Sequence, residues 1–114
     1  MCHVLVIEDE GFIAMMIQDC LIEYGATSVD VAASEAEAIA CAQQHRPDFI
    51  TSDVRLVEGT GPHAVAAITQ LYGDIPVLFI TASPEKCEAY PPAAVMRKPV
   101  TFAAVGRRFK MLYH

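Results

Sequence analysis

The chain has 114 residues, a formal net charge of −6 and 54% apolar residues. This length suits one domain around a single core, and the composition is too apolar for a disordered chain. The negative charge argues against nucleic acid and anionic membrane as direct partners, and no apolar run approaches the roughly 20 residues of a membrane span.

Short apolar runs alternate with helical patterns along the whole chain. Five runs are typical of strands buried in a parallel sheet, and they are expected at His3–Ile7, Thr27–Ala32, Asp48–Asp53, Pro76–Ile80 and Ala94–Met96. Four stretches carry an apolar stripe at helical spacing, and they are expected from about Glu10 to Tyr24, Glu35 to Gln44, Pro62 or His63 to Tyr72, and Phe102 to Leu112. The alternation predicts one α/β domain over residues 1–114, a flavodoxin-like (βα)5 three-layer sandwich with a five-stranded parallel sheet.

The stretch between Thr81 and Lys98 breaks this rhythm. It contains Pro84, Pro91 and Pro92 and has little apolar periodicity. Because proline interrupts helices, at most one or two turns fit, at about residues 84–89. We therefore expect the fourth helix of the fold to be shortened or irregular.

Cysteines and histidines show no ligand or disulfide spacing. The cysteines are scattered without a C-x-x-C pair: Cys2, Cys20, Cys41 and Cys87. The histidines lie at the ends of the chain or near expected loops: His3, His45, His63 and His114. The pattern favours a reduced protein in the cytoplasm and does not favour a histidine metal site. With an apolar run beginning almost at the first residue, we expect no signal or transit segment.

Polar side chains follow four of the predicted strands. Glu8 and Asp9 end the first apolar run, Asp53 the third, Thr81 the fourth and Lys98 the fifth. The carboxyl ends of parallel strands meet at one edge of a sheet, so we expect these side chains to lie together. Clustered carboxylates repel one another unless a cation lies among them, and Mg²⁺ suits such oxygen ligands. This arrangement can hold a phosphoryl group on an aspartate.

Each of these residues also has an ordinary structural role. Glu8 and Asp9 would suit the first turn of a helix, and Asp53 would suit a turn or helix cap. Thr81 is a common strand residue, and Lys98 alone would be a solvated charge. The coincidence of all of them at one sheet edge is what favours a site.

On these residues the chain resembles the receiver domain of bacterial response regulators, over its whole length. Glu8-Asp9 resembles the family's acidic pair, Asp53 its phosphoryl-accepting aspartate and Thr81 its switch hydroxyl. Lys98-Pro99 resembles its lysine-proline pair, and Gly61 falls where the family often has a glycine. The resemblance implies Mg²⁺-dependent transfer from a phosphohistidine to Asp53, followed only by loss of the phosphoryl group, so the chain is not expected to be an enzyme in the usual sense.

The resemblance also implies roles for single residues. Asp9, Asp53 and the backbone carbonyl of Arg55 would ligate Mg²⁺, and Glu8 would act through a bound water. Lys98, after a cis peptide bond to Pro99, would meet the phosphoryl oxygen, as would the Thr81 hydroxyl. The Arg55 guanidinium would be free to pair with Glu8, Glu58 or Glu85, or to meet the phosphoryl group.

The implied partners are a sensor histidine kinase or a histidine phosphotransferase, and an unknown downstream protein. No further domain follows in this sequence, so we expect a single-domain response regulator whose output is a protein contact or onward phosphotransfer. Phe12 and Met15 fall off the core face of the first helix. They are either ordinary surface residues or a docking patch for the phosphodonor.

The chain departs from the family in the segment that transmits the signal. Val95 stands where receivers commonly carry an aromatic residue, and Tyr90, before the double proline, is not expected to replace it. The stretch from Phe79 to Glu85 resembles a subgroup of stand-alone receivers linked to stress-signalling kinases.

Two alternative functions match the sequence less well. A phosphatase of the haloacid dehalogenase type would need an Asp-x-Asp motif, but Arg55 occupies its second position. A receiver-like interaction module that works without phosphorylation is the stronger alternative, because Val95 and the shortened helix weaken the usual switch.

Overall fold

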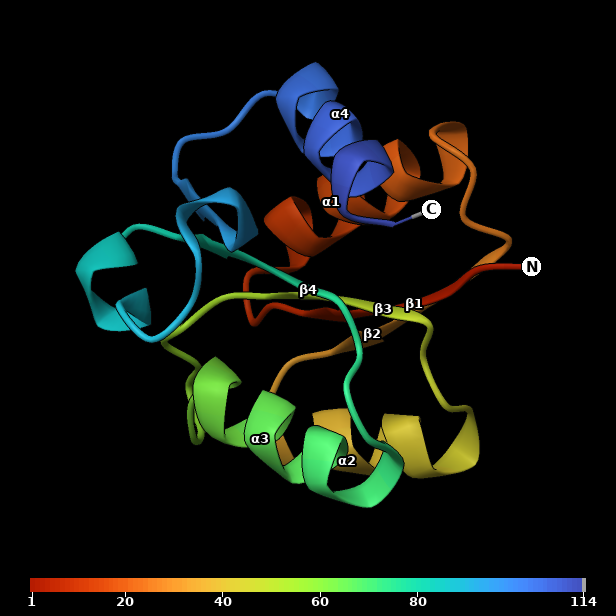
Figure 1. Cartoon of the computed structure of the whole chain (residues 1–114), viewed down its shortest axis with the longest axis vertical. Helices are drawn as coiled ribbons and strands as arrows, with labels where there is room; N and C mark the ends of the chain where they lie inside the picture. Colours follow the sequence, from red (N-terminus) through yellow and green to blue (C-terminus); the bar gives the residue numbers. More distant parts are fainter. Residues whose placement is uncertain (114) are drawn as a thin grey trace.

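The structure, a computed structural model, describes residues 1–113, and His114 lies outside the described residues. Its five parallel strands follow the order β2-β1-β3-β4-β5. They are β1 (His3–Ile7), β2 (Ser28–Ala32), β3 (Phe49–Ser52), β4 (Val77–Thr81) and β5 (Val95–Arg97). Helices α1 (Gly11–Glu23) and α4 (Phe102–Leu112) cover one face, and α2 (Glu35–Gln44) and α3 (Gly61–Tyr72) cover the other (Figure 1). The predicted three-layer, flavodoxin-like fold is confirmed.

The sheet separates two apolar cores. Successive side chains of a strand point to opposite faces, so β1 feeds both. Val4 and Val6 pack in the core under α1 and α4, and Leu5 and Ile7 pack in the core over α2 and α3. Every residue of β1 is buried, as its continuous apolar run predicted.

Strand β1 and helices α2 and α4 have the predicted ends, and the ends of the other elements differ by at most two residues. Helix α3 begins at Gly61 because the Thr60 hydroxyl accepts a hydrogen bond from the His63 N–H at 3.3 Å and so caps the helix. Strand β4 begins after Pro76, which has no N–H to give to the sheet. Ser34 caps α2 and Thr101 caps α4, because their side chains accept hydrogen bonds from the backbone N–H groups of Glu37 and Ala104.

The segment between β4 and β5 contains two short 3₁₀ turns, η1 (Pro84–Cys87) and η2 (Pro92–Ala94). This confirms the shortened helix, although η2 was not expected. The Tyr90 ring packs on the Phe79 ring with centroids 4.5 Å apart, which holds the segment against β4. No helix within residues 1–113 is long and apolar enough to cross a membrane.

Candidate functional site

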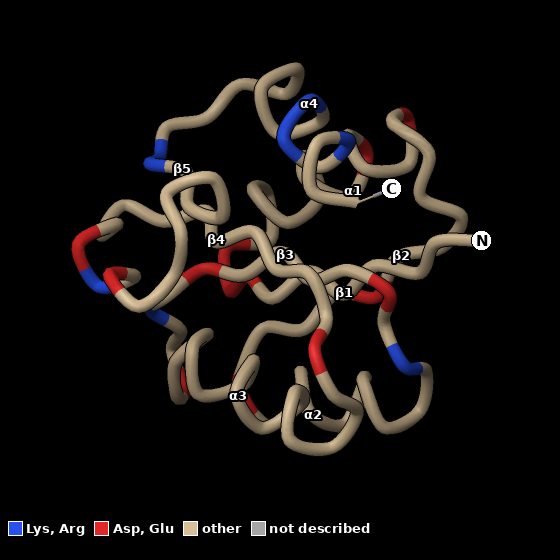
Figure 2. The backbone as a smooth tube through the Cα atoms, in the orientation of Figure 1, with Lys and Arg blue, Asp and Glu red and all other residues tan. Residues whose placement is uncertain are grey.

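The carboxyl ends of β1 and β3 bring three acidic side chains together. The Asp53 N–H donates to the carbonyl of Ile7 at 2.9 Å, which holds the residue after β3 beside the end of β1. Glu8, Asp9 and Asp53 each place a carboxylate oxygen within 4.8 Å of the others. Figure 2 shows these strand ends as a group of acidic positions, with basic positions directly beyond β5.

Lys98 joins two of the three acids. Its Nζ donates to Glu8 Oε1 at 2.8 Å and to Asp53 Oδ2 at 2.9 Å. The Lys98 N–H donates to the Thr81 carbonyl at 2.8 Å, and the Lys98-Pro99 peptide is cis, as the resemblance implied. Burial acts to lower the pKa of Lys98, but the hydrogen bonds to Glu8 and Asp53 outweigh it and raise the pKa. Lys98 is therefore a charged bridge across the site.

The two acids of the pair have different surroundings. Glu8 is only 2% exposed, and its Oε2 accepts a hydrogen bond from the Glu10 N–H at 3.1 Å. Burial raises the pKa of Glu8, and the Lys98 ammonium offsets only part of that rise. Asp9 is half-buried, and within residues 1–113 its carboxylate has no hydrogen-bond donor. Its oxygens are thus the ones most available to a cation.

The backbone around Asp53 is tightly arranged. Asp53 Oδ1 accepts a hydrogen bond from the Val54 N–H at 2.7 Å, and the Ser52 hydroxyl donates to the Asp53 carbonyl at 2.7 Å. A Cβ at Gly61 would lie 1.7 Å from that carbonyl oxygen, so only glycine allows the loop to approach this closely. The family resemblance pointed to Gly61, but no sequence signal pointed to Ser52.

Thr81 and Arg55 complete the set of predicted site residues. Thr81 is buried at the end of β4, where its Oγ1 accepts a hydrogen bond from the Ser83 N–H at 2.9 Å. Its own O–H hydrogen therefore remains available to another acceptor. Arg55 is exposed and makes no ion pair with any described residue, whereas Glu8, one of its three suggested partners, pairs with Lys98. The role of the Arg55 carbonyl stays a prediction.

The donor set suits Mg²⁺. Magnesium prefers hard oxygen ligands, commonly one or two carboxylates, and the three clustered acids supply such oxygens. Lys98 occupies one oxygen each of Glu8 and Asp53, which leaves the Asp9 carboxylate and further oxygens for a cation.

Comparisons with known proteins agree with this geometry. The family model for the response regulator receiver domain matches residues 4–95. The phyllosphere-induced regulator PhyR of Methylorubrum extorquens is 36% identical over 109 residues, which are 91% of this chain but 40% of PhyR. The chemotaxis protein CheY of Bacillus subtilis is 31% identical over 83 residues, 72% of this chain and 69% of CheY.

Solved structures of receiver-domain proteins also resemble this chain. The receiver domain of Erythrobacter litoralis PhyR superimposes with a TM-score of 0.87 at 29% identity, over 97% of this chain and 88% of that one. PhyR from Brucella abortus superimposes with a TM-score of 0.86 at 31% identity, over 97% of this chain and 47% of that one. The family consists of signalling modules rather than enzymes that turn over a substrate. The chain belongs to the response regulator receiver domain family.

Proposed function

We propose that Asp53 accepts a phosphoryl group from a phosphohistidine in an Mg²⁺-dependent reaction. An Asp53 carboxylate oxygen attacks phosphorus, the phosphorus–nitrogen bond breaks, and the leaving imidazole takes a proton. The observation that carries this proposal is the Lys98 bridge. The Lys98 ammonium contacts the Asp53 carboxylate, while the neighbouring Asp9 carboxylate has no hydrogen-bond donor among the described residues and is available to Mg²⁺. A carboxylate is a weak nucleophile, so positioning and charge neutralisation must supply most of the rate.

The surrounding residues then have separate tasks. Asp9 and Asp53, with the Arg55 carbonyl and Glu8 through water, would hold Mg²⁺, which neutralises phosphoryl charge when bound. Lys98 contacts Asp53 Oδ2, and after phosphorylation its ammonium would bind an oxygen of the phosphoryl group on Asp53. The hydroxyl hydrogen of Thr81 would donate to a phosphoryl oxygen. Ala82 next to it is small and leaves room for attacking water.

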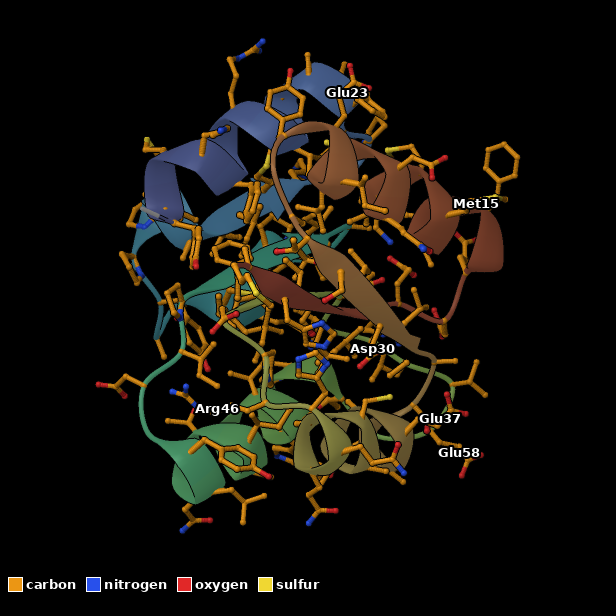
Figure 3. The ribbon with its side chains drawn as sticks, turned by 90° about the vertical axis from the view of Figure 1, so that its right-hand side faces the viewer. Met15, Glu23, Asp30, Glu37, Arg46 and Glu58 are labelled. Carbon is orange, nitrogen blue, oxygen red and sulfur yellow. The ribbon has the colours of Figure 1, made fainter. Side chains whose placement is uncertain are left out.

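The phosphodonor is proposed to be a sensor histidine kinase or a histidine phosphotransferase that docks on α1. Phe12 is 83% exposed and Met15 is 55% exposed, and Met15 lies on the outer side of this helix (Figure 3). One hollow beside them is lined by Phe12, Met15, Met16, Asp19 and Phe102. A second is lined by Ile13, Met16, Lys98, Pro99 and Val100, so the apolar surface extends to the site lysine. An apolar patch of this kind suits a helical partner.

The docking patch has a direct test. Met15→Glu should slow phosphotransfer from the kinase while leaving labelling by acetyl phosphate unchanged, because only the kinase contacts the patch. Exposed Ile22 on the same helix provides the control variant Ile22→Glu, which should keep both rates. Equal loss with both phosphodonors would contradict the docking role.

The output is proposed to be a protein contact of the phosphorylated form or onward phosphotransfer. A solved relative from Bartonella quintana, of which this chain covers 48%, is named an anti-anti-sigma factor, a title that supports an output by protein contact. We propose a reduced, cytoplasmic setting because the four cysteines show no disulfide spacing along the chain. The chain spans less than half of PhyR, so the activity of the complete PhyR is not carried over.

Labelling with acetyl phosphate separates this function from an interaction module that needs no phosphorylation. We expect Mg²⁺-dependent labelling that disappears in Asp53→Ala. The control is Asp74→Ala, because Asp74 is exposed before β4, at the other end of the sheet. No labelling of the native chain would defeat the proposal and favour the interaction module.

A further inference from the structure

A second group of candidate ligands lies at the amino-terminal side of the sheet, away from the acidic site. His3, Asp30 and His45 each place one ligand atom within 4.8 Å of the others. Their spacing along the chain did not predict this group. In Figure 3, which looks onto the β2 side of the molecule, Asp30 lies near the centre, between the two helical layers.

The parallel register explains how the group forms. His3 of β1 pairs with Ser28 of β2, and Asp30 is two residues further along β2, on the same face of the sheet. Helix α2 covers that face and runs back toward the strand starts. Its C-cap residue is His45, which therefore arrives beside His3.

Hydrogen bonds set the position of His3. Its ring is buried, with Nε2 3.0 Å from Asp30 Oδ2 and Nδ1 2.7 Å from Ser28 Oγ. Its backbone N–H donates to Asp48 Oδ2 at 2.9 Å. In a metal-binding histidine one ring nitrogen binds the ion and the other donates to an oxygen, and Ser28 Oγ lies where it can accept that second hydrogen bond.

His45 has the freedom that His3 lacks. Its ring stacks on that of His3 with centroids 3.5 Å apart and planes 6° apart. Two parallel rings cannot both direct a nitrogen lone pair at one ion, so His45 must turn to become a ligand. It is exposed, and no described residue hydrogen-bonds to its ring. Asp30 is also partly exposed, so an ion reaches the group from solvent.

We propose that His3, Asp30 and His45 form a binding site for a divalent transition metal of the zinc type. Two imidazoles and one carboxylate are ligands that Zn²⁺ prefers and Mg²⁺ does not. Nε2 of His3 binds the metal in place of its contact with Asp30, and the single proton of the neutral ring then lies on Nδ1 and is donated to Ser28 Oγ. Three protein ligands leave a fourth position for water. The ion ties the end of α2 to the β1–β2 edge and raises the stability of the fold.

The test is calorimetric titration of the untagged chain with Zn²⁺ in excess Mg²⁺, which keeps the acidic site occupied. We expect one tight Zn²⁺ per chain, a rise in melting temperature, and tetrahedral absorption bands when Co²⁺ replaces Zn²⁺. His45→Ala should weaken binding by about tenfold or more, and Asp30→Asn should do the same. Both changed residues are at least partly exposed, so both variants should fold.

Two control variants locate the ion. His63→Ala changes an exposed histidine on α3 and should leave Zn²⁺ affinity unchanged. Asp53→Asn changes the acidic site and should also leave it unchanged, whatever its effect on phosphorylation. The proposal is overturned if native protein binds no Zn²⁺ under these conditions, if His45→Ala binds like native, or if only Asp53→Asn loses binding.

Discussion

The strand-end site and the η1–η2 segment are neighbours in space but differ in how they are built. Glu8, Asp9 and Asp53 directly follow β1 and β3, two central strands whose residues are all buried. The segment between β4 and β5 is held by backbone bonds that each span three residues, such as the Tyr90 N–H to the Cys87 carbonyl at 3.0 Å. The three acidic side chains of the site therefore rest on fully buried strands, and the segment between β4 and β5 carries none of them.

The same contrast applies to the aromatic residues. Val95, where receivers commonly carry an aromatic side chain, lies in β5 beside Phe79 of β4. The ring that actually packs on Phe79 is that of Tyr90, from the irregular segment. If the two regions are separable, changes at Tyr90 should alter stability without altering phosphorylation chemistry, and changes near Asp53 should alter both.

Gly61→Ala should give the largest effect. The added methyl group would overlap the Asp53 carbonyl oxygen, which also accepts the Ser52 hydroxyl, so the loop must move. We expect a loss of about 2 kcal/mol in the free energy of unfolding, together with slower labelling by acetyl phosphate, measured by denaturant titration and by phosphoprotein electrophoresis.

The matched control is Gly11→Ala. A Cβ at Gly11 has no heavy atom within 4 Å, and alanine favours the helix in which it lies. This variant should be as stable as the native chain or slightly more so. Native stability and labelling in Gly61→Ala would show that the close approach of the loop does not position Asp53.

Tyr90→Ala should lower stability by about 1–2 kcal/mol, less than a fully buried aromatic, because the ring is only half-buried. The initial rate of labelling of Asp53 by acetyl phosphate should stay the same, since Tyr90 contacts none of the charged residues of the site. Tyr90→Phe keeps the contact with Phe79 and should be nearly as stable as native. Slower labelling in Tyr90→Ala would mean that the two regions are coupled.

The difference between the regions also explains what could be predicted from sequence. The buried runs of β1 and β3 identify central strands, and parallel strands bring their carboxyl ends together, so Glu8, Asp9, Asp53 and Lys98 were found as one site. The Tyr90–Phe79 contact was not predicted. The prolines between β4 and β5 interrupt the helical spacing of apolar residues, and that spacing is what indicates which side chains face the core. The meeting of His3 with Asp30 and His45 was missed because it depends on strand register and on where α2 ends.

Asp9→Asn should raise stability by about 1 kcal/mol in the absence of Mg²⁺, because it removes one of three clustered negative charges. Asp9 is one of three clustered carboxylates and receives no hydrogen bond from the described residues, so the change removes its repulsion with Glu8 and Asp53. The variant should gain less stability from Mg²⁺ than the native chain, because it lacks a ligand. Melting temperatures with and without Mg²⁺ measure both effects. Asp74→Asn, far from the cluster, should show neither, and a loss of stability in Asp9→Asn would contradict the repulsion.

Thiol labelling should show the smallest difference, as an order of rates in native protein. Cys41 is partly exposed and should react first with an uncharged thiol reagent at mildly alkaline pH. Cys87 and Cys20 are both buried, and burial raises both pKa values, that of Cys20 to about 11. Cys87 lies in a single 3₁₀ turn, whereas Cys20 lies within α1, a 13-residue helix, and its Sγ donates to the Phe102 carbonyl at 3.0 Å. Local opening costs less in the short turn, so Cys87 should react before Cys20. Mass spectrometry of timed samples gives the order of reaction. If Cys20 reacts as fast as Cys87, the segment between β4 and β5 is as stable as the core that supports the site.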